Sequence, residues 1–380
     1  MISCGEASGD LYAGALAREL RALEAGTEVF GFGGDQLAAA GGTLVGDYRG
    51  YAVTGLTEVV RQLPRTYAMY RRLVAAARER RPDVFVAVDF PDFNFRLGAA
   101  LHRLGVPVVY YVSPQLWAWR PGRLATMRRF VRKVLVIFPF EAAIYREAGV
   151  PVEFVGHPLV DLLAADEPGA PFLTGLGLDP TAPTVGLLPG SRPNEVRRLL
   201  PVLRDAAALV AARVPAVQFV VARAPRLDDE LFAPIAGAKR LGLRVASVSN
   251  RTDAVLSAAD VVITASGTAT VQTALHGTPM VIVYKLSPTT YRLGIRFVRV
   301  DTYGMVNLVA GERLVPELIQ DACTPATVAD ATLGLLTDPA RSAAMRAALA
   351  DVRHRLGEPG ASRRAAAAVL AVARGGDALV

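Results

Sequence analysis

The stretch DVVITASGTAT, residues 260–270, is the most informative part of the 380-residue chain. Its apolar run 261–264 is continuous enough for a strand that is covered on both faces. The Ser266-Gly267-Thr268 turn then leads into a helical pattern that ends near 276–279, and a second apolar run follows at 280–284. A strand, a helix and another strand in this order predict a parallel α/β sheet.

The same alternation occurs along most of the chain. Further apolar runs of strand length lie at 84–88, 106–112, 134–138, 184–188 and 217–222. Each is followed by a turn rich in glycine, proline or serine and then by a helical stretch, as expected for crossover connections. By contrast, the glycine-rich segment 31–34 lacks the spacing of a dinucleotide-binding loop, and we interpret it as a turn.

The length and the turn composition predict two domains. A chain of 380 residues exceeds the size at which one hydrophobic core usually keeps growing. We expect an N-terminal domain at 1–160, a turn-rich linker at 161–183 and a second domain at 184–340. The alanine-rich helices of 341–380 are expected to pack back across to the first domain.

Composition and charge restrict the class of protein. No apolar run approaches the roughly 18 residues that span a bilayer, and Glu6 and Asp10 interrupt the place of a signal peptide, so we expect a cytoplasmic protein. The net charge of +7 favours an anionic partner, although an arginine-rich composition also results from a GC-rich genome. Cys4, Cys323 and the four scattered histidines have no metal-ligand spacing, and no Asp-x-Asp pair occurs, so we expect neither a metal nor another cofactor.

Two motifs place carboxylates at the ends of strands in the first half. The segment 4–12 combines Glu6, Ser8 and Asp10 with two glycines at a strand-to-helix turn. Open α/β sheets bind ligands at this edge, but for such a short motif taken alone we favour an ordinary helix cap by Ser8 or Asp10. In the segment 86–94 a buried strand ends in Asp89, and a carboxylate in that position suits a general base.

Both tryptophans of the chain lie within three positions, in the segment 111–120. Trp117 and Trp119, followed by Arg120, suit either stacking on a sugar or docking on acyl chains, beside a phosphate. Packing of the aromatic rings in the core is an equally good interpretation.

Two turns in the second half suit binding of a diphosphate. In the segment 187–197, Ser191 is positioned to cap the following helix, and Arg192 lies at its N-terminus, where the helix dipole favours an anion. This is not a P-loop, because the Gly-Lys-Ser/Thr ending is absent. The Ser266-Gly267-Thr268 turn adds a close-approach backbone and two hydroxyls at another helix start.

Together these segments resemble, in order and over nearly the full length, the lipid-A-disaccharide synthase family. The similarity rests on five motifs: 5–10, 89–94, 111–120, 188–196 and 265–269. It implies a GT-B fold, in which two Rossmann-like domains face each other across a cleft and a C-terminal segment returns to the first domain. It also implies an inverting, metal-independent enzyme that joins UDP-2,3-diacylglucosamine to 2,3-diacylglucosamine 1-phosphate through a β-1,6 bond and releases UDP.

The resemblance also implies roles for individual residues. Asp89 would deprotonate the acceptor 6-hydroxyl, Glu6 would lie near the acceptor, and Arg192 would stabilise the departing diphosphate as a third catalytic residue. The remaining positions would bind the substrates: Ser8, Asp10, Asn94, Trp117, Arg120, Ser191, Ser266, Gly267, Thr268, Gln272 and Asn307.

Three positions depart from the family pattern. Only three residues precede the opening turn, so the first strand is expected to be very short. Gln272 replaces an acidic residue that is placed to bind ribose hydroxyls, and an amide binds them without charge assistance. The sequence Met305-Val306-Asn307 keeps only the asparagine of the family's Leu-Pro-Asn.

The stretch 48–74 alternates apolar side chains with arginines, as suits a surface that rests on the inner leaflet of an anionic membrane. A buried amphipathic helix is an equally simple interpretation. A homodimer is also compatible with the sequence, whereas nucleic acid is not expected as a partner. Alternatives to the disaccharide synthase are another UDP-sugar transferase, an epimerase on the same fold, and a UDP-binding protein with impaired turnover.

Overall fold

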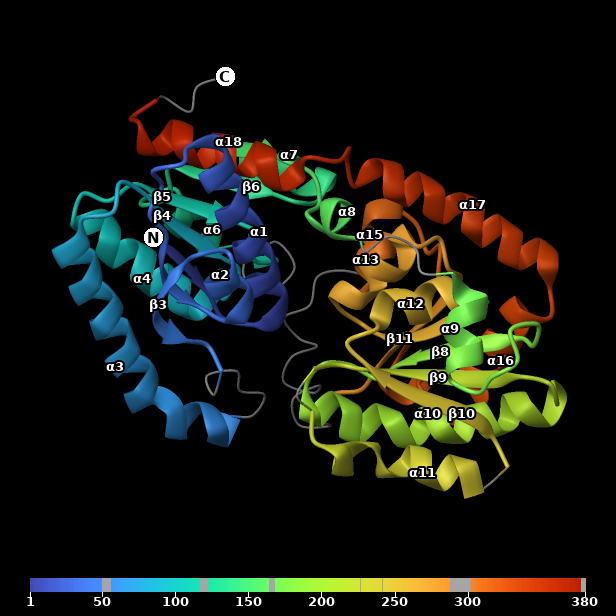
Figure 1. The fold of residues 1–380 in the computed structure, drawn as a ribbon. Helices are drawn as coiled ribbons and strands as arrows, with labels where there is room; N and C mark the ends of the chain where they lie inside the picture. The colour runs from blue at the N-terminus through green and yellow to red at the C-terminus, as the bar shows by residue number, and fades with distance from the viewer. Residues whose placement is uncertain are drawn as a thin grey trace. The chain divides into compact units, whose positions relative to one another are not determined.

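The computed structural model describes residues 1–49, 56–116, 122–163, 168–225, 227–240, 242–287 and 302–376. The chain divides into two compact units, which are seen as two separate sheets with their helices in Figure 1. Unit 1 consists of Met1–Asp161 and Leu356–Val380, and unit 2 of Leu162–Arg355. Unit 1 is therefore discontinuous in sequence.

The sheet of unit 1 has seven strands in the order β3-β2-β1-β4-β5-β6-β7. All neighbouring strands pair in parallel, and the three-residue β1 lies in the middle of the sheet. The strands are β1 (Ile2–Cys4), β2 (Phe30–Gly33), β3 (Thr43–Asp47), β4 (Phe85–Val88), β5 (Val108–Tyr111), β6 (Lys133–Val136) and β7 (Val152–Phe154).

Helices cover both faces of this sheet, as Figure 1 shows. The helices are α1 (Ala7–Leu23), α2 (Asp35–Ala39), α3 (Leu56–Arg80), α4 (Pro91–Arg103), α6 (Gly122–Met127), α7 (Pro139–Glu147), α8 (Leu159–Leu162) and α18 (Ala361–Ala373). On one face, Leu73 of α3 and Leu101 of α4 pack in one core with Tyr110 of β5. On the other face α18 packs against α1 and β5, so the consecutive Tyr110 and Tyr111 serve different layers.

The glycine-rich segment 31–34 is not a turn as we interpreted it, because Phe30–Gly33 forms β2. Gly31 has a φ of 153°, and a Cβ atom there would lie 1.8 Å from the carbonyl oxygen of Ile2. The glycine therefore lets β2 approach β1 closely, and any larger residue would push the two strands apart.

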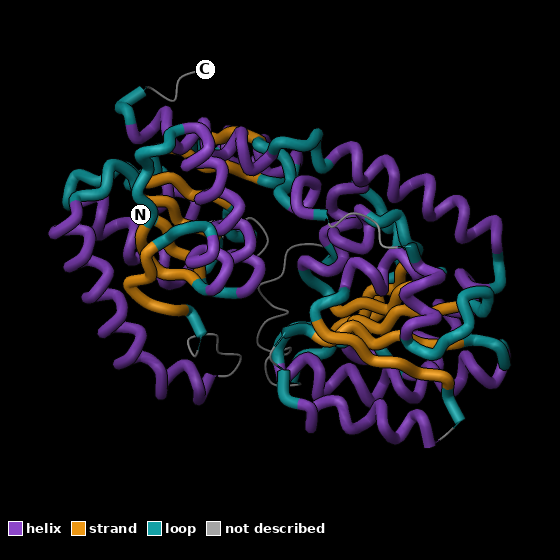
Figure 2. Tube along the Cα trace, in the orientation of Figure 1, coloured by secondary structure: helices purple, strands orange, loops and turns teal. Residues whose placement is uncertain are grey.

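The sheet of unit 2 has six parallel strands in the order β10-β9-β8-β11-β12-β13, drawn in orange in Figure 2. They are β8 (Thr184–Leu188), β9 (Gln218–Arg223), β10 (Arg244–Ser249), β11 (Val261–Ala265), β12 (Met280–Tyr284) and β13 (Glu317–Ile319). The α-helices are α9 (Gly169–Gly175), α10 (Pro193–Arg213), α11 (Ala233–Arg240), α12 (Thr252–Ala258), α13 (Thr268–Leu275), α15 (Met305–Ala310), α16 (Pro325–Leu336) and α17 (Pro339–Arg355). Single 3₁₀ turns lie at Asp229–Phe232 and Gln320–Ala322.

The unit boundaries differ in detail from the sequence expectation. Residues 169–175, placed in the linker, form α9, whose Phe172 and Leu173 are buried as the helix packs against α12 of unit 2. Of the two C-terminal helices, α17 packs on α13 and α15 of unit 2, and only α18 belongs to unit 1. In unit 1, Asp161 fastens α18 by accepting hydrogen bonds from the backbone N–H groups of Gly360 (2.6 Å) and Ser362 (2.8 Å).

Candidate functional site

Both sheets contain a topological switch point, where the chain turns towards opposite sides of the sheet after two neighbouring strands. In unit 1 the switch lies between β1 and β4, where Cys4 pairs with Val88. In unit 2 it lies between β8 and β11, where Leu188 pairs with Thr264. Ligands of open α/β sheets bind beyond the carboxyl ends of strands at such points. Most of the candidate residues follow these four strands, whereas Trp117 and Arg120 follow β5 in the chain and Asn307 follows β12.

Asp89 follows β4 at the switch point of unit 1, and its backbone is held tightly. Asp89 and Phe90 have φ values of 46° and 51°, a left-handed conformation that is unfavourable for residues with a side chain. The carbonyl oxygen of Asp89 accepts hydrogen bonds from the hydroxyl of Tyr110 and the Nδ2 of Asn94, both at 2.8 Å. Burial raises the pKa of Tyr110, so its hydroxyl remains a donor. These bonds hold the backbone of the turn that carries the half-buried Asp89 side chain.

Glu6 lies in the turn after β1, beside the Asp89 turn. The two turns meet where Gly5 packs on the ring of Phe90, because a Cβ atom on Gly5 would lie 2.1 Å from that ring. Ser8 donates a hydrogen bond of 2.9 Å from Oγ to the carboxylate of Glu6. The structure thus brings Glu6, Ser8 and Asp89 to one end of the sheet.

Asp10 and Asn94 are buried and bonded within the protein. The carboxylate of Asp10 accepts from the backbone N–H groups of Gly34 (2.7 Å), Gln36 (2.9 Å) and Leu37 (3.2 Å), which caps α2. Asn94 also accepts from the Oγ of Ser3 at 2.7 Å. Their bonds position the two turns, and neither side chain is exposed for contact with a ligand.

The loop that contains both tryptophans, in the segment 111–120, is only partly described. Trp117 and Arg120 lie outside the described residues. Of the side chains nearby, Arg123 forms an ion pair of 2.5 Å with Asp92, and its guanidinium lies 5.4 Å from the ring centre of Phe95. Asp92 therefore has a partner of its own in the first turn of α4.

In unit 2, the turn after β8 exposes Ser191 and Arg192 at the start of α10. Glu195, and not Ser191 as we expected, caps this helix. Its carboxylate accepts from the backbone N–H groups of Ser191 and Arg192 at 3.3 Å and from the Arg192 guanidinium at 3.1 Å. The capping bond fixes Arg192 at the helix N-terminus. A glutamate in the first turn of the predicted helix, at the third helical position, is the sequence signal that could have indicated this cap.

The Ser266-Gly267-Thr268 turn follows β11 and starts α13. Gly267 has a φ of 147°, and no atom lies near the position of a Cβ there, so backbone conformation alone requires glycine. Its carbonyl accepts the hydroxyl of Thr270 at 2.8 Å. The first N–H groups of an α-helix have no partners within the helix, so this exposed turn offers donors to an anion.

Gln272 lies one turn further along α13, and its side chain contacts Asp253, a residue that the sequence analysis did not single out. Its Nε2 donates to Asp253 at 2.7 Å, and Asp253 also binds His276 at 2.8 Å. Asp253 is 19 positions from Gln272, so no local signal predicted the contact.

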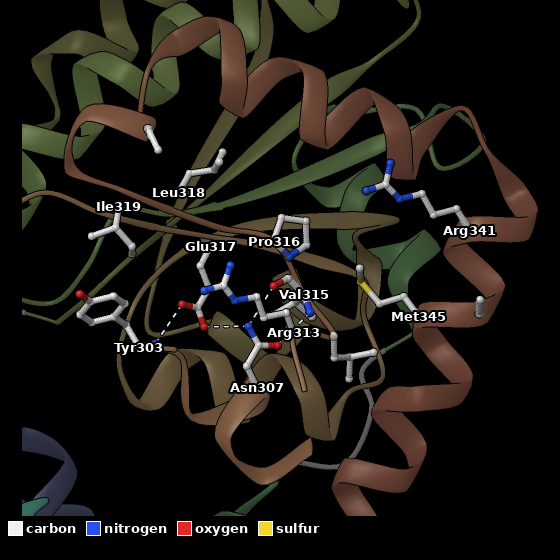
Figure 3. Close-up of a pocket in the computed structure, with 13 residues that line it drawn as sticks. Tyr303, Asn307, Arg313, Val315, Pro316, Glu317, Leu318, Ile319, Arg341 and Met345 are labelled. Atoms are coloured by element: carbon white, nitrogen blue, oxygen red, sulfur yellow. Dashed lines mark hydrogen bonds between the residues drawn. The ribbon is translucent and has the colours of Figure 1, made fainter. Parts of the chain in front are cut away.

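Among the described residues, the side chain of Asn307 bonds residues of its own neighbourhood and none of the turns described above. It is buried, and it bonds the backbone of Val315 at 2.9 Å and the carboxylate of Glu317 at 2.7 Å, as Figure 3 shows. Glu317 also accepts from the backbone of Tyr303 at 2.9 Å. The pocket that these residues line measures about 680 Å³ and lies at the edge strand β13, away from the switch point. Asn307 therefore supports the shape of unit 2 through contacts inside the protein.

Comparison with known proteins identifies the family. The model of the lipid-A-disaccharide synthetase family matches residues 1–372. The chain belongs to the lipid-A-disaccharide synthase family. Lipid-A-disaccharide synthase of Geobacter metallireducens is 44% identical over 97% of this chain and 96% of its own length. The enzyme of Koribacter versatilis is 44% identical over 99% of both chains.

Solved structures agree in fold. UDP-GlcNAc 2-epimerase from Neisseria meningitidis, bound to UDP-GlcNAc, matches 97% of this chain and 98% of its own with a TM-score of 0.65. At 13% identity this likeness concerns the fold alone. Together with the two parallel sheets it confirms the GT-B class, and the family makes the protein a glycosyltransferase of the lipid-A-disaccharide synthase type.

Proposed function

We propose that this protein transfers the diacylglucosamine group of UDP-2,3-diacylglucosamine to the 6-hydroxyl of 2,3-diacylglucosamine 1-phosphate. The acceptor oxygen forms a bond to the anomeric carbon as the bond to UDP breaks, so the configuration inverts in one displacement. Family membership over residues 1–372 is the observation that carries this proposal. The displacement needs a base for the acceptor and stabilisation of the leaving diphosphate.

Asp89 is the proposed base, and Glu6 is proposed to lie beside the acceptor. The backbone carbonyl of Asp89 accepts hydrogen bonds from both Tyr110 and Asn94, so the turn that carries the carboxylate is held before substrate binds. The Ser8 hydroxyl orients Glu6 through a bond of 2.9 Å. In this assignment Asp10 and Asn94 are positioning residues, while Trp117 and Arg120 remain sequence predictions for acceptor binding.

Arg192 and the Ser266-Gly267-Thr268 turn are the proposed diphosphate site. Two helix N-termini, those of α10 and α13, begin beyond adjacent strands and place partial positive charge on one side of the sheet. Arg192 adds a guanidinium, which is also paired with Glu195 at 3.1 Å, and Ser191 adds a hydroxyl. Negative charge that develops on the departing UDP is stabilised there. Asn307 supports this unit from its interior.

A transfer assay on the purified protein tests the activity. With acylated donor and acceptor we expect UDP release and a disaccharide of the corresponding mass in the mass spectrum. Transfer from unacylated UDP-glucosamine alone would indicate a different UDP-sugar transferase. Conversion of the UDP-sugar to its epimer, without any disaccharide, would indicate an epimerase like the protein of similar fold. Tight UDP binding without release of UDP from the donor would indicate a protein with impaired turnover.

Helix α3 supports a proposal of peripheral membrane binding. None of the helices in the described ranges is long and apolar enough to cross a membrane. Met69 and Leu73 of α3 are buried, whereas Leu63 and Tyr67 are 51% and 62% exposed. Exposed arginines follow on the same helix, which suits an anionic surface. Co-sedimentation with anionic and neutral vesicles, with Leu63→Ser as the variant, tests this proposal.

The oligomeric state is a separate question. The sequence is compatible with a homodimer, and sedimentation equilibrium of the purified protein measures the mass that decides it.

A further inference from the structure

Asp253 joins two helices beside the proposed diphosphate site. It lies in the first turn of α12, directly after the turn that ends β10. Its Oδ1 accepts hydrogen bonds from Nε2 of Gln272 at 2.7 Å and from Nε2 of His276 at 2.8 Å. His276 is held in turn by Ser257, whose Oγ lies 3.1 Å from Nδ1. The carboxylate is therefore fixed against α13.

This contact places the carboxylate on the ligand-binding side of α13. Thr268, Gln272 and His276 are four positions apart, so their side chains share one face of the helix. Thr268 starts the helix at the proposed diphosphate site, and Gln272 follows four residues later, a rise of about 6 Å along the helix axis. A nucleotide places its ribose hydroxyls at a comparable separation from its 5′-phosphate. Asp253 and Gln272 therefore lie where the ribose of a bound nucleoside diphosphate would be.

Each of the two side chains keeps one oxygen available. Within the described part of the chain, Oδ2 of Asp253 and Oε1 of Gln272 accept no hydrogen bond. Neither atom is among the buried polar atoms that lack a partner, and the Asp253 side chain is 28% exposed, so both oxygens reach solvent. Two neighbouring acceptors complement two neighbouring hydroxyls.

The protonation state of Asp253 suits this contact. Burial alone would raise its pKa, but the hydrogen bonds from His276 and Gln272 outweigh burial and bring the pKa below its ordinary value. The carboxylate is therefore ionised at neutral pH and accepts charge-assisted hydrogen bonds.

Ser257, His276 and Asp253 are hydrogen-bonded in a row, and this order resembles that of a Ser-His-Asp catalytic triad. However, the His276 side chain is only 3% exposed, so no substrate reaches its ring. The arrangement holds the Asp253 carboxylate in place and is not the centre of a second reaction.

We propose that Asp253, together with Gln272, binds the vicinal ribose hydroxyls of the nucleoside-diphosphate donor. The proposal rests on the proposed function, which supplies the nucleotide. It makes Asp253 a residue that determines specificity for ribonucleotides.

Calorimetric titration of the full-length protein with UDP and with 2′,3′-dideoxy-UDP tests this site. The wild-type protein is expected to bind UDP at least about ten-fold more tightly than the dideoxy nucleotide. In Asp253→Asn the ratio of the dideoxy-UDP dissociation constant to the UDP dissociation constant falls towards one, because affinity for UDP drops and affinity for dideoxy-UDP stays the same. Adding Gln272→Glu to that variant returns a carboxylate to the site and restores the preference. Asp330→Asn is the control, because Asp330 is an exposed carboxylate of unit 2 paired with Arg213.

The other outcomes separate this site from the proposed function. Equal weakening of both nucleotides by Asp253→Asn would show a purely structural role and overturn the proposal. Wild-type protein that binds both nucleotides equally well would overturn the ribose site while the UDP donor stands. Wild-type protein that binds neither nucleotide would overturn both.

Discussion

The turn after β4 in unit 1 and the turn after β11 in unit 2 occupy equivalent places in their sheets, next to the central strands β1 and β8. In the first turn two residues with side chains, Asp89 and Phe90, have φ values of 46° and 51°. In the second turn a glycine, Gly267, has a φ of 147°. The two turns thus reach positive φ values in different ways, one with side-chain-bearing residues and the other with a glycine.

The difference follows from what each turn presents. Unit 1 presents a side chain, so the unusual conformation falls on Asp89, the proposed base, and is stabilised by bonds from Tyr110 and Asn94. Unit 2 presents backbone N–H groups, so the residue at the tight position needs no side chain. Equivalent positions of the same topology therefore hold a carboxylate in one unit and the proposed anion site in the other.

The largest effect is expected for Asp89→Asn. An amide accepts no proton, so the rate of transfer falls about 10²- to 10⁴-fold while UDP binding is unchanged. Steady-state kinetics and a UDP titration measure the two quantities. Asp92→Asn is the matched control, because Asp92 is an exposed carboxylate of the same turn. Near-normal transfer by Asp89→Asn would show that Asp89 is not the base, and the proposed difference in role between the two turns would then be wrong.

Arg192→Ala tests the anion site of unit 2. Loss of a charged donor is expected to weaken UDP binding about ten- to hundred-fold and to lower the rate as well. Arg197→Ala removes an exposed arginine further along α10 and serves as the control. Unchanged UDP affinity in Arg192→Ala would place the diphosphate elsewhere.

Gly267→Ala tests the backbone of the same site. Its φ of 147° and ψ of −160° belong to a region that only glycine populates readily, so alanine costs about 1–3 kcal/mol of stability or distorts the turn. Thermal unfolding and UDP titration measure both effects. Gly237→Ala in α11, where no atom lies within 4 Å of the new methyl group, should instead be neutral or stabilising. Equal behaviour of the two variants would contradict the assignment.

His157, after β7 at the same edge of unit 1, is expected to affect stability alone, and only below about pH 6.5. Burial lowers its pKa to about 3, so the unfolded chain takes up a proton that the folded protein excludes. Stability therefore falls as the pH decreases from about 6.5 towards 3, by up to about 1.4 kcal/mol per pH unit. His157→Asn should reduce this slope in urea unfolding between pH 7 and 4.5. Identical slopes for the two proteins would show that His157 is not the group responsible.

The central strands could be predicted from sequence, and the outer ones could not. Buried runs such as 184–188 and 261–264 are continuous apolar stretches and form β8 and β11. The outer strands β3 and β10 have partly exposed side chains, so their sequences lack such a run. In β2 the glycine content, which at Gly31 allows close approach to β1, led to the prediction of a turn.

The site divides in the same way. Asp89 and the Ser266-Gly267-Thr268 turn could be found because each directly follows an apolar run, and the chain itself places them at the sheet edge. The bonds that make Asp10 a cap for α2, and those that bring Asp253 to Gln272, join residues far apart in sequence. Such contacts depend on packing between elements, and no local pattern encodes them.

The return of α18 to unit 1 has a consequence for the order in which the protein folds during synthesis. Unit 2 is one continuous segment, Leu162–Arg355, and its sheet is complete when the ribosome has released that segment. Unit 1 begins first but finishes last, because α1 keeps an uncovered apolar face until α18 has been made. The carboxylate of Asp161 likewise gains its hydrogen bonds from Gly360 and Ser362 only after those residues have been synthesised. A nascent or truncated chain that stops before residue 361 therefore exposes a surface that chaperones and proteases recognise.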